Sequence, residues 1–293
     1  MRFQLIDEHR DELPVTLMCK VLDVSPSGYY AWRQRPPSAR EMANQELYAK
    51  IEAVYKANCE VYGSPRIYRE LRKQKVVCSE NRVARLMRLR GLKAKQTKRF
   101  KTTTKRNKSH PVAPNLLRRD FETDRPNQKW LADITYIPTQ EGWLYLAAVL
   151  DLHCRRIVGW AMSDRMTSDL TLAALEMALL RLPRDTELIH HSDQGSQYTD
   201  QEYQTLLKNH GIRASMNGAG TWYDNAPMES FFGTLKSELV HHRAYRTRTD
   251  AKADVFYYIE SFYNRRRLHS ALDYLSPEEY EQLYYQQQEV IFA

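Results

Sequence analysis

The sequence predicts an α/β protein with an all-helical front part, and three observations support this prediction. Segments 130–137, 142–151 and 156–162 are rich in β-branched and aromatic residues, which is typical of consecutive strands. Helix and strand patterns then alternate as far as residue 216. Before residue 93, by contrast, the apolar residues recur at helical spacing. The expected order is a group of short helices, a three-stranded meander, and then alternating helices and strands.

Turn residues divide the front part into two helix pairs. The first pair begins with helix 13–22, whose apolar residues at 15, 18, 21 and 22 share one face, and Ser25 can cap its second helix with Pro26 at the first position. This pair fits either a DNA-binding helix-turn-helix or an ordinary helical hairpin. The remaining helices of the front part are expected at 39–58, 62–72 and 79–88. Beyond the meander we expect helix 168–182, strand 187–191, helix 200–210, strand 212–216, helix 249–263 and a last helix capped at Ser276.

Charge is distributed unevenly along the chain. Residues 1–120 contain 27 Lys and Arg against 12 Asp and Glu, whereas residues 121–293 contain 17 against 24. Residues 81–119 carry 14 basic residues and no acid. A basic front joined to an acidic back indicates a part that grips DNA phosphates followed by a part that binds metal ions. A solvated lysine-rich surface, the alternative, fits poorly with so strong a local concentration.

The sequence argues against several other classes of protein. Cys19, Cys59, Cys78 and Cys154 show no CxxC spacing, and His9 has no partner at a spacing typical of zinc ligands. The N-terminus has no apolar core of a secretory signal, and no run approaches the roughly 18 apolar residues of a membrane helix. We therefore expect a cytoplasmic protein with reduced thiols.

Three acidic residues in the back part stand where metal-dependent chemistry would need them. Asp133 lies within the first expected strand, Asp193 follows the strand at 187–191, and Glu229 lies in the first turn of an expected helix. Carboxylates that converge at one sheet edge suit hard divalent cations, which prefer oxygen ligands. Two such ions can clamp the attacking and leaving oxygens of a phosphoryl transfer.

Other acids compete with these three on pattern alone. Asp151 ends a strand and can face the same edge, and Glu238 lies close in sequence to Glu229. Asp224 is a further rival, although it can instead cap the helix of Glu229 together with Asn225.

The sequence around the acids is specific enough to identify a family. The segments HSDQGSQY at 191–198 and WYDNAPMESFF at 222–232 are the most informative, and 35 residues separate Asp193 from Glu229. They resemble the catalytic core of the DDE transposases of bacterial insertion sequences, which share the retroviral integrase fold, and more narrowly the second-reading-frame (OrfB) product of that group. The resemblance runs from about residue 13 to about residue 280.

This resemblance implies a ribonuclease-H-like catalytic core and a polynucleotidyl transferase. In the family the first Asp bridges two Mg²⁺ or Mn²⁺ ions, and the second Asp and the Glu bind one ion each. Position by position, these are Asp133, Asp193 and Glu229. Water would cleave DNA at the element end, and the freed 3′ hydroxyl would then attack a second phosphodiester. The expected partners are double-stranded DNA, as terminal inverted repeats and as target, and further copies of the chain in a dimer or larger homo-oligomer, without a membrane.

The resemblance also divides the chain into four expected regions. They are a helical, helix-turn-helix-like DNA-binding region at 1–92, a basic linker or arm at 93–122, the integrase-type catalytic core at 123–245 and a C-terminal helical extension at 246–293.

Basic and aromatic side chains near these regions are candidates for DNA contact. Lys236 lies two helical turns after Glu229 on the same helix face. Trp222 and Tyr223 lie in a glycine-rich loop and can stack on a base or pack in the core. The remaining candidates belong to helix 79–88 and the basic arm: Arg82, Arg85, Arg88, Lys93, Lys95, Lys98 and Arg99.

Several neighbouring residues have two interpretations. His191 can hydrogen-bond beside the acids or simply pack at the end of its strand. Arg265, Arg266 and Arg267 can contact phosphate or decorate a surface, whereas Phe231 and Phe232 are expected in the core.

Three other functions stay open at this stage. The chain could be a metal-dependent nuclease that cuts without joining, a DNA-binding regulator with an inactive core, or an accessory fragment that acts only when fused to an upstream reading frame. The intact acidic triad argues against the regulator.

Overall fold

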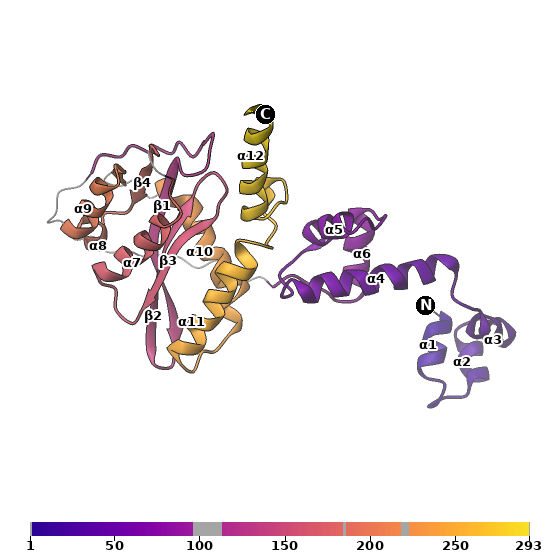
Figure 1. Cartoon of the computed structure of the whole chain (residues 1–293). Helices are drawn as coiled ribbons and strands as arrows, with labels where there is room; N and C mark the ends of the chain where they lie inside the picture. The colour runs from indigo at the N-terminus through magenta and orange to yellow at the C-terminus, as the bar shows by residue number, and fades with distance from the viewer. Residues whose placement is uncertain (1, 96–112, 184–185, 218–222, 293) are drawn as a thin grey trace.

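The structure is a computed structural model that describes residues 2–95, 113–183, 186–217 and 223–292. An α/β core and a helical front part lie one after the other along an elongated molecule (Figure 1). The last helix stands beside the core, next to the point where the helical part joins it (Figure 1). None of the helices in the described part combines the length and apolar character that crossing a bilayer requires.

The N-terminal unit has a small core of its own. Its helices are α1 (Arg2–Glu8), α2 (Val15–Val21) and α3 (Pro26–Gln34). As predicted, Ser25 caps α3 by accepting a hydrogen bond from the Gly28 N–H at 3.0 Å, and Pro26 is the first helical residue. Two details differ from expectation: α1 was not predicted, and Val21 is 75% exposed instead of facing the core. The core consists of Ile6, Met18, Cys19 and Tyr29.

The second helical unit is built around one long helix. It contains α4 (Ala39–Ala57), α5 (Ser64–Lys73) and α6 (Glu80–Leu89), as the sequence predicts. Ser38 and Glu41 form a capping box that starts α4. Gly91, with φ of +71°, turns the chain away after α6 in a conformation that disfavours other residues.

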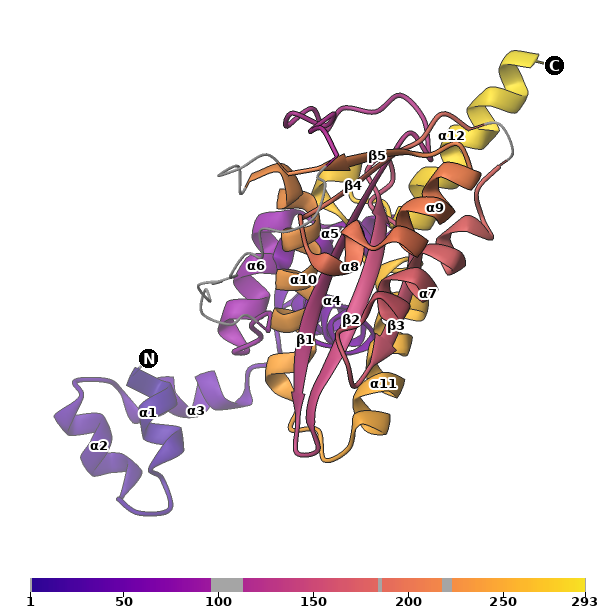
Figure 2. The ribbon, with the colours of Figure 1, turned by 90° about the vertical axis from the view of Figure 1, so that its left-hand side faces the viewer.

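A five-stranded mixed sheet forms the middle of the core. Its strands are β1 (Lys129–Thr139), β2 (Gly142–Asp151), β3 (Ile157–Ser163), β4 (Ile189–Ser192) and β5 (Arg213–Met216). The spatial order is β3-β2-β1-β4-β5 (Figure 2). The pairs β1–β2 and β2–β3 are antiparallel, whereas the pairs β1–β4 and β4–β5 are parallel. A three-stranded meander followed by two parallel strands is the ribonuclease-H-like arrangement, so the predicted fold class is confirmed.

Helices cover both faces of this sheet. The helices of the core are α7 (Ser168–Leu179), α8 (Ser196–Thr199), α9 (Gln201–Asn209), α10 (Ala226–Glu238) and α11 (Arg248–Phe256). Successive strand residues point to opposite faces, so Trp130 packs with α7 and α9, whereas Leu131 packs with α10 and α11. Phe231 and Phe232 of α10 are buried in that second layer, as predicted.

The C-terminal region departs from the single helix expected at 249–263. Thr247 and Asp250 form a capping box at α11, and a π-helical segment, η3 (Tyr257–Tyr263), continues it. Ser276 caps α12 (Pro277–Phe292), as predicted, by accepting from the Glu279 N–H at 3.3 Å. Three short 3₁₀ segments complete the described elements: η1 (Tyr223–Asn225), η2 (Val240–His242) and η4 (Ser270–Leu272).

The second helical unit is joined to the core through the segment that follows η3. The Tyr62 hydroxyl donates to the carbonyl of Arg266 at 3.0 Å and accepts from the N–H of Leu268 at 2.9 Å. Arg66 Nε donates to the carbonyl of Leu268 at 2.9 Å. These bonds use side chains of the helical unit to satisfy backbone groups of the core segment in a partly buried junction, so the two parts are packed and are not merely linked by the chain.

A buried ion pair completes this junction and corrects one of the sequence interpretations. Both guanidinium Nε and Nη2 of Arg267 donate to Glu238, at 2.8 and 2.7 Å, and the two side chains are 6% and 7% exposed. Arg267 therefore neither decorates a surface nor faces phosphate. A buried carboxylate needs such a partner, because an unpaired charge in the interior is costly.

Two glycines in the core give opposite expectations for replacement by alanine. A Cβ at Gly159 of β3 would lie 2.2 Å from the carbonyl oxygen of Ala174 in α7, whereas a Cβ at Gly233 of α10 meets nothing within 4 Å. We expect Gly159→Ala to lower the free energy of unfolding by about 1–3 kcal/mol through overpacking. We expect Gly233→Ala to raise it by roughly 0.5–1 kcal/mol, because glycine is unfavourable inside a helix. Urea unfolding of the two variants measures both, and an unchanged Gly159→Ala protein would show that β3 and α7 are not packed this closely.

Candidate active site

The parallel pairing of β1 with β4 sets the position of two of the predicted acids. Leu131 pairs with His191 in register. Asp133 and Asp193 each lie two residues further along the chain, so Asp193, just beyond the end of β4, continues the register toward Asp133 on β1; neighbouring strands run about 4.8 Å apart. Since β4 ends at Ser192, Asp193 is the first residue of the following loop.

Helix α10 supplies the third acid and a cation. Glu229 lies in its first turn, as predicted, and α10 packs on the sheet face toward which the odd-numbered residues of β1 point. Lys236 lies further along α10, with its Nζ 4.7 Å from the ring centroid of Tyr136, which is half-exposed on β1. It is close enough to Asp133 for the two charges to influence each other.

The electrostatics of Asp133 show that the three acids share one environment. Burial and then the negative charge of Asp193 raise the pKa of Asp133 to about 8, and Glu229 adds to this effect. A hydrogen bond from the Ile134 N–H at 2.8 Å and the charge of Lys236 oppose it. Burial also raises the pKa values of Asp193 and Glu229. Carboxylates whose charged forms destabilise one another in this way form a site that attracts cations.

The donor set of this site suits a hard divalent cation, although its side chains are not arranged as a finished coordination shell. Among the residues that the structure describes, no group of three or more His, Cys, Asp or Glu is compact enough to hold a metal ion. Within the same residues, no Lys, Arg or His forms a salt bridge with Asp133, Asp193 or Glu229. Mg²⁺ and Mn²⁺ prefer oxygen ligands, and these carboxylates have no salt-bridge partner in the described residues that would compete with a metal ion. The chemistry of the three acids therefore fits such ions.

Hydrogen bonds hold the ends of β4 and β5 together beside Asp193. The His191 imidazole contacts the Ser215 hydroxyl at 2.8 Å through Nδ1 and the Asn217 side-chain oxygen at 2.7 Å through Nε2. The Gly195 N–H donates to Asp193 at 2.9 Å. Burial lowers the pKa of His191. His191 is therefore packed at the strand end, and its side-chain contacts link β4 to Ser215 and Asn217 at the end of β5.

The structure gives the rival acids other partners. Asp151 accepts hydrogen bonds from the backbone N–H groups of Asn127, His153 and Cys154, and so closes the turn after β2. Glu238 accepts hydrogen bonds from the Arg267 guanidinium and from the Tyr258 hydroxyl, each at 2.8 Å.

Asp224 is not the helix cap that the sequence allowed. The N-cap residue of α10 is Asn225, and its side chain makes no capping hydrogen bond. Asp224 instead accepts from the side-chain amide of Asn115 at 2.8 Å. The sequence provided no signal for this partner, because Asn115 lies in the expected linker and 109 residues away.

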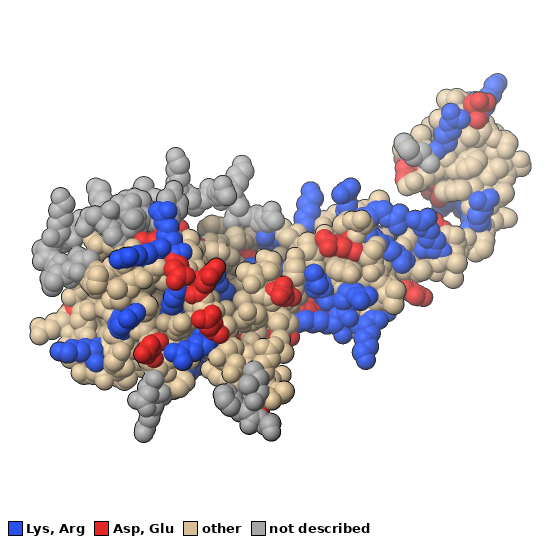
Figure 3. All heavy atoms as spheres, turned by 90° about the horizontal axis from the view of Figure 1, so that it is seen from above, with Lys and Arg blue, Asp and Glu red and all other residues tan. Residues whose placement is uncertain are grey.

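The candidate DNA-contact residues are in different situations. Arg85 and Arg88 are exposed on α6. Figure 3 shows Lys and Arg side chains gathered on the surface of the helical part. Arg82 is half-buried and donates from Nε to Asn44 at 3.0 Å. Lys93 is exposed, whereas Lys95 donates to the carbonyl of Cys59 at 3.1 Å and lies 3.2 Å from Glu60. Lys98, Arg99, Trp222 and the side chain of Tyr223 lie outside the described residues.

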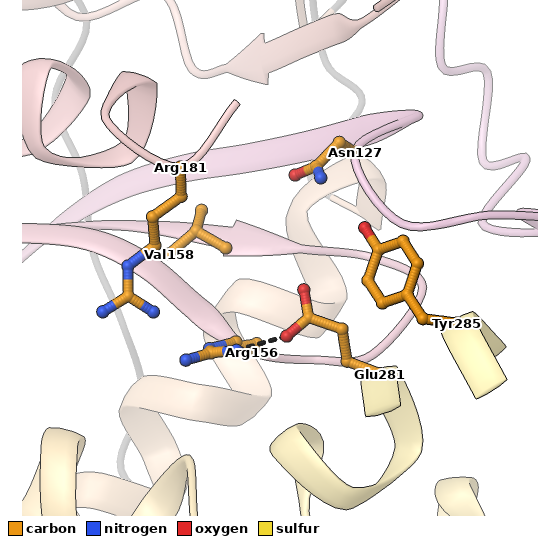
Figure 4. Close-up of a pocket in the computed structure, with 6 residues that line it drawn as sticks. All are labelled: Asn127, Arg156, Val158, Arg181, Glu281 and Tyr285. Carbon is orange, nitrogen blue, oxygen red and sulfur yellow. Dashed lines mark hydrogen bonds and ion pairs between the residues drawn. The ribbon is translucent and has the colours of Figure 1, made fainter. Parts of the chain in front are cut away.

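A pocket of about 360 Å³ lies elsewhere in the core, between the sheet and α12 (Figure 4). Figure 4 shows Arg156 directed toward Glu281, with which it forms an ion pair, while Tyr285 approaches from α12. None of the predicted acids lines this pocket. Its lining residues are Asn127, Arg156, Val158, Arg181, Glu281 and Tyr285.

Comparison with known families identifies both parts of the chain. Models described as "Integrase core domain" match residues 123–221 and 229–284, and one described as "HTH-like domain" matches residues 42–100. The chain is 45% identical over 269 residues to "Insertion element IS600 uncharacterized 31 kDa protein" of Shigella sonnei, which covers 92% of this chain and 99% of the relative. It is 44% identical over 283 residues to "Transposase InsF for insertion sequence IS3A" of Escherichia coli K12, covering 96% and 98%.

Solved structures resemble the chain more distantly. A simian T-cell lymphotropic virus intasome bound to a PP2A regulatory subunit matches at 15% identity with a TM-score of 0.47, over 75% of this chain and 70% of the other. The HTLV-2 integrase catalytic core domain in complex with magnesium matches at 16% identity with a TM-score of 0.43, over 55% and 99%.

The raised pKa of Asp133 predicts a stability that depends on pH. The folded protein holds this proton up to about pH 8, whereas an unfolded Asp releases it near pH 4, so the folding free energy becomes less favourable as the pH rises through that window. Asp133→Asn removes the effect. In a metal-free buffer the variant should match the wild type at pH 4 and exceed its free energy of unfolding by on the order of 2–4 kcal/mol at pH 8.

Exposed Asp11 serves as the control, since Asp11→Asn should follow the wild type at every pH. Chemical unfolding across the pH range makes the comparison. Parallel profiles for wild type and Asp133→Asn would contradict the shared electrostatic environment.

Proposed function

This chain belongs to the transposases of IS3-type insertion sequences, and on that premise we propose that it cleaves DNA at the ends of its mobile element and joins the freed 3′ hydroxyl to a second DNA site. The family establishes a DNA-binding polynucleotidyl transferase. The observation that carries the finer proposal is the electrostatic coupling of Asp133 to Asp193 and Glu229 at the end of the parallel strands. The three acids come from separate parts of the sequence. Within the described residues, no Lys, Arg or His forms a salt bridge that would neutralise their charges.

We assign Asp133, Asp193 and Glu229 as the ligands of two divalent ions, Mg²⁺ or Mn²⁺. Bound there, the ions would lower the pKa of the attacking oxygen and neutralise charge on the phosphate. Water attacks the phosphodiester at the element end, the P–O bond to the 3′ oxygen breaks, and that oxygen leaves as a hydroxyl. The same hydroxyl then attacks the phosphorus of a second phosphodiester and loses its proton. The P–O bond to the 3′ oxygen of the attacked strand breaks, and that oxygen takes up a proton and leaves as a 3′ hydroxyl.

The protein's own groups contribute position and charge to both steps. Asp133 lies within the paired strand β1, Asp193 directly follows β4, and Glu229 lies in the first turn of α10, so each acid is placed by an adjoining regular element. Lys236, on the same helix as Glu229, has its charge near Asp133 and is suited to contact a DNA phosphate beside the acids.

We propose that the helical part grips the DNA. Its exposed Arg85 and Arg88 project from the second helix of the pair α5–α6, which is the position of a recognition helix in helix-turn-helix units. Joining two element ends requires two copies at once, so we also propose a dimer or larger homo-oligomer on DNA.

The triad is tested by amide substitutions. Asp133→Asn, Asp193→Asn and Glu229→Gln each remove one metal-binding charge with little change of shape. Purified protein with Mn²⁺ and labelled DNA carrying the native element ends should lose both cleavage and joining by at least about 100-fold in each variant, while DNA affinity is retained. Because Glu238 is already paired with Arg267, activity that survives Glu229→Gln would refute the assignment of Glu229.

The same assay separates a transposase from a nuclease of the same fold. A transposase converts the labelled ends into joined products that are longer than the substrate, whereas a nuclease stops at shorter ones. A wild-type protein that cuts but never joins would overturn the strand-transfer part of the proposal.

The grip on DNA is tested through its salt dependence. Replacing Arg85 and Arg88 by Gln should weaken binding to all sequences and reduce the slope of log K against log salt by about 0.9 for each lost phosphate contact. Lys252→Gln on α11, also an exposed cation, is the matched control and should leave the slope unchanged. Equal slopes for the double variant and the wild type would show that α6 does not contact phosphate.

A further inference from the structure

Asp224 occupies an unusual place beside the proposed active site. It lies in η1, directly before α10, and five residues ahead of Glu229. It is only 1% exposed, and one of its oxygens, Oδ1, has no hydrogen-bond partner in the described structure. The nearest cation is Arg119, whose Nε lies 3.9 Å from that oxygen. A carboxylate this buried is costly to keep, so its retention calls for a specific role.

The partner of Asp224 is a turn that lies across the end of the sheet. Asn115 donates from its side-chain amide to Asp224 Oδ2 at 2.8 Å. Its side-chain carbonyl accepts from the backbone N–H groups of Leu117 and Arg118 at 3.1 and 3.0 Å. The orientation of the Asn115 amide is thus defined, because its oxygen faces two N–H donors and its nitrogen faces the Asp224 carboxylate.

This turn is strained and is anchored to the strands that carry Asp193. Arg118 and Arg119 both have positive φ, at 47° and 61°, which is unfavourable for residues other than glycine. The Leu116 N–H donates to the Ser215 hydroxyl at 2.9 Å. That hydroxyl also contacts His191, two residues before Asp193. Hydrogen bonds, together with the peptide link between Leu116 and Asn115, therefore connect the end of β4 with Asp224 in η1, two residues before α10.

We propose that Asn115 and Asp224 form a positioning pair that fixes the start of α10, and with it Glu229, relative to Asp193. Neither residue is assigned to the chemistry itself. The inference rests on the proposed function, because it concerns the geometry of that same site. An error of about 1 Å in the placement of a reacting group can cost on the order of 100-fold in rate, which is the scale on which such a pair would matter.

A reversal of the hydrogen bond tests the pair. Asn115→Asp places a second carboxylate against Asp224, and the two repel each other in a buried site. Adding Asp224→Asn to this variant restores one amide and one carboxylate, but the amide at position 224 now donates to the carboxylate at position 115. The new carboxylate at position 115 can still accept from the N–H groups of Leu117 and Arg118. Asp224→Asn alone keeps an oxygen for the Asn115 amide, so its effect should be small.

We expect Asn115→Asp to lower the joining rate at saturating DNA by about 100-fold, with DNA affinity unchanged, and the double variant to recover to within about threefold of Asp224→Asn alone. Asn209→Asp adds the same charge at an exposed position on α9 and should remain active. Should Asn115→Asp fail to fold, Asn115→Ala removes the hydrogen bond without adding charge and is expected to lower the joining rate about tenfold.

The outcomes separate the pair from the proposed function. If the wild type joins DNA and Glu229→Gln does not, the proposed function stands. Given that, a double variant as impaired as Asn115→Asp, or an Asn115→Asp protein as active as the wild type, overturns the positioning pair. Loss of at least about 100-fold in Asp224→Asn alone would likewise overturn it, because that pattern belongs to a metal ligand.

Discussion

The parallel pairing of β1 with β4 determines where this chain can perform chemistry. It places Asp133 and Asp193 at the same level, although 59 residues separate them in the sequence. All the surrounding structure supports that pairing: β2 and β3 extend the sheet on one side, β5 extends it on the other, and helices bury both faces. Backbone hydrogen bonds are a stiff support, so Asp133 within β1 and Asp193 directly after β4 require little further adjustment.

Helix α10 links the site to the DNA-binding part of the molecule. Glu229 lies in its first turn, Lys236 follows two turns later, and Glu238 at its last residue binds Arg267. The backbone beside Arg267 is in turn hydrogen-bonded to Tyr62 of the helical unit. One rigid element therefore carries a proposed metal ligand at one end and the junction with the helical unit at the other. Packed structure thus relates the position of the helical unit, which we propose to grip DNA, to the position of the acids.

The sequence predicts local features of this molecule well and distant pairings poorly. The strands of the meander and the caps at Ser25 and Ser276 follow from patterns within a few residues, and all are found. The pairs Glu238–Arg267 and Asn115–Asp224 lie 29 and 109 residues apart, and no local pattern distinguishes a buried arginine in a basic run from an exposed one. Asp224 resembles a helix cap in sequence, but Asn225 takes the N-cap position and a 3₁₀ turn precedes it.

The partners of the acids separate structural carboxylates from proposed catalytic ones. Asp151 is satisfied by three backbone N–H groups, and Glu238 by an arginine and a tyrosine. Asp133 and Asp193 are only partly buried and Glu229 is exposed, yet none of the three has a salt-bridge partner among the described residues, and the charges of Asp193 and Glu229 both raise the pKa of Asp133. Folding alone gains nothing from such an arrangement, because it destabilises the charged form of Asp133 and so raises the pKa of this carboxyl. In the proposed function, divalent cations would supply the missing positive charge, and their binding would displace a proton from Asp133.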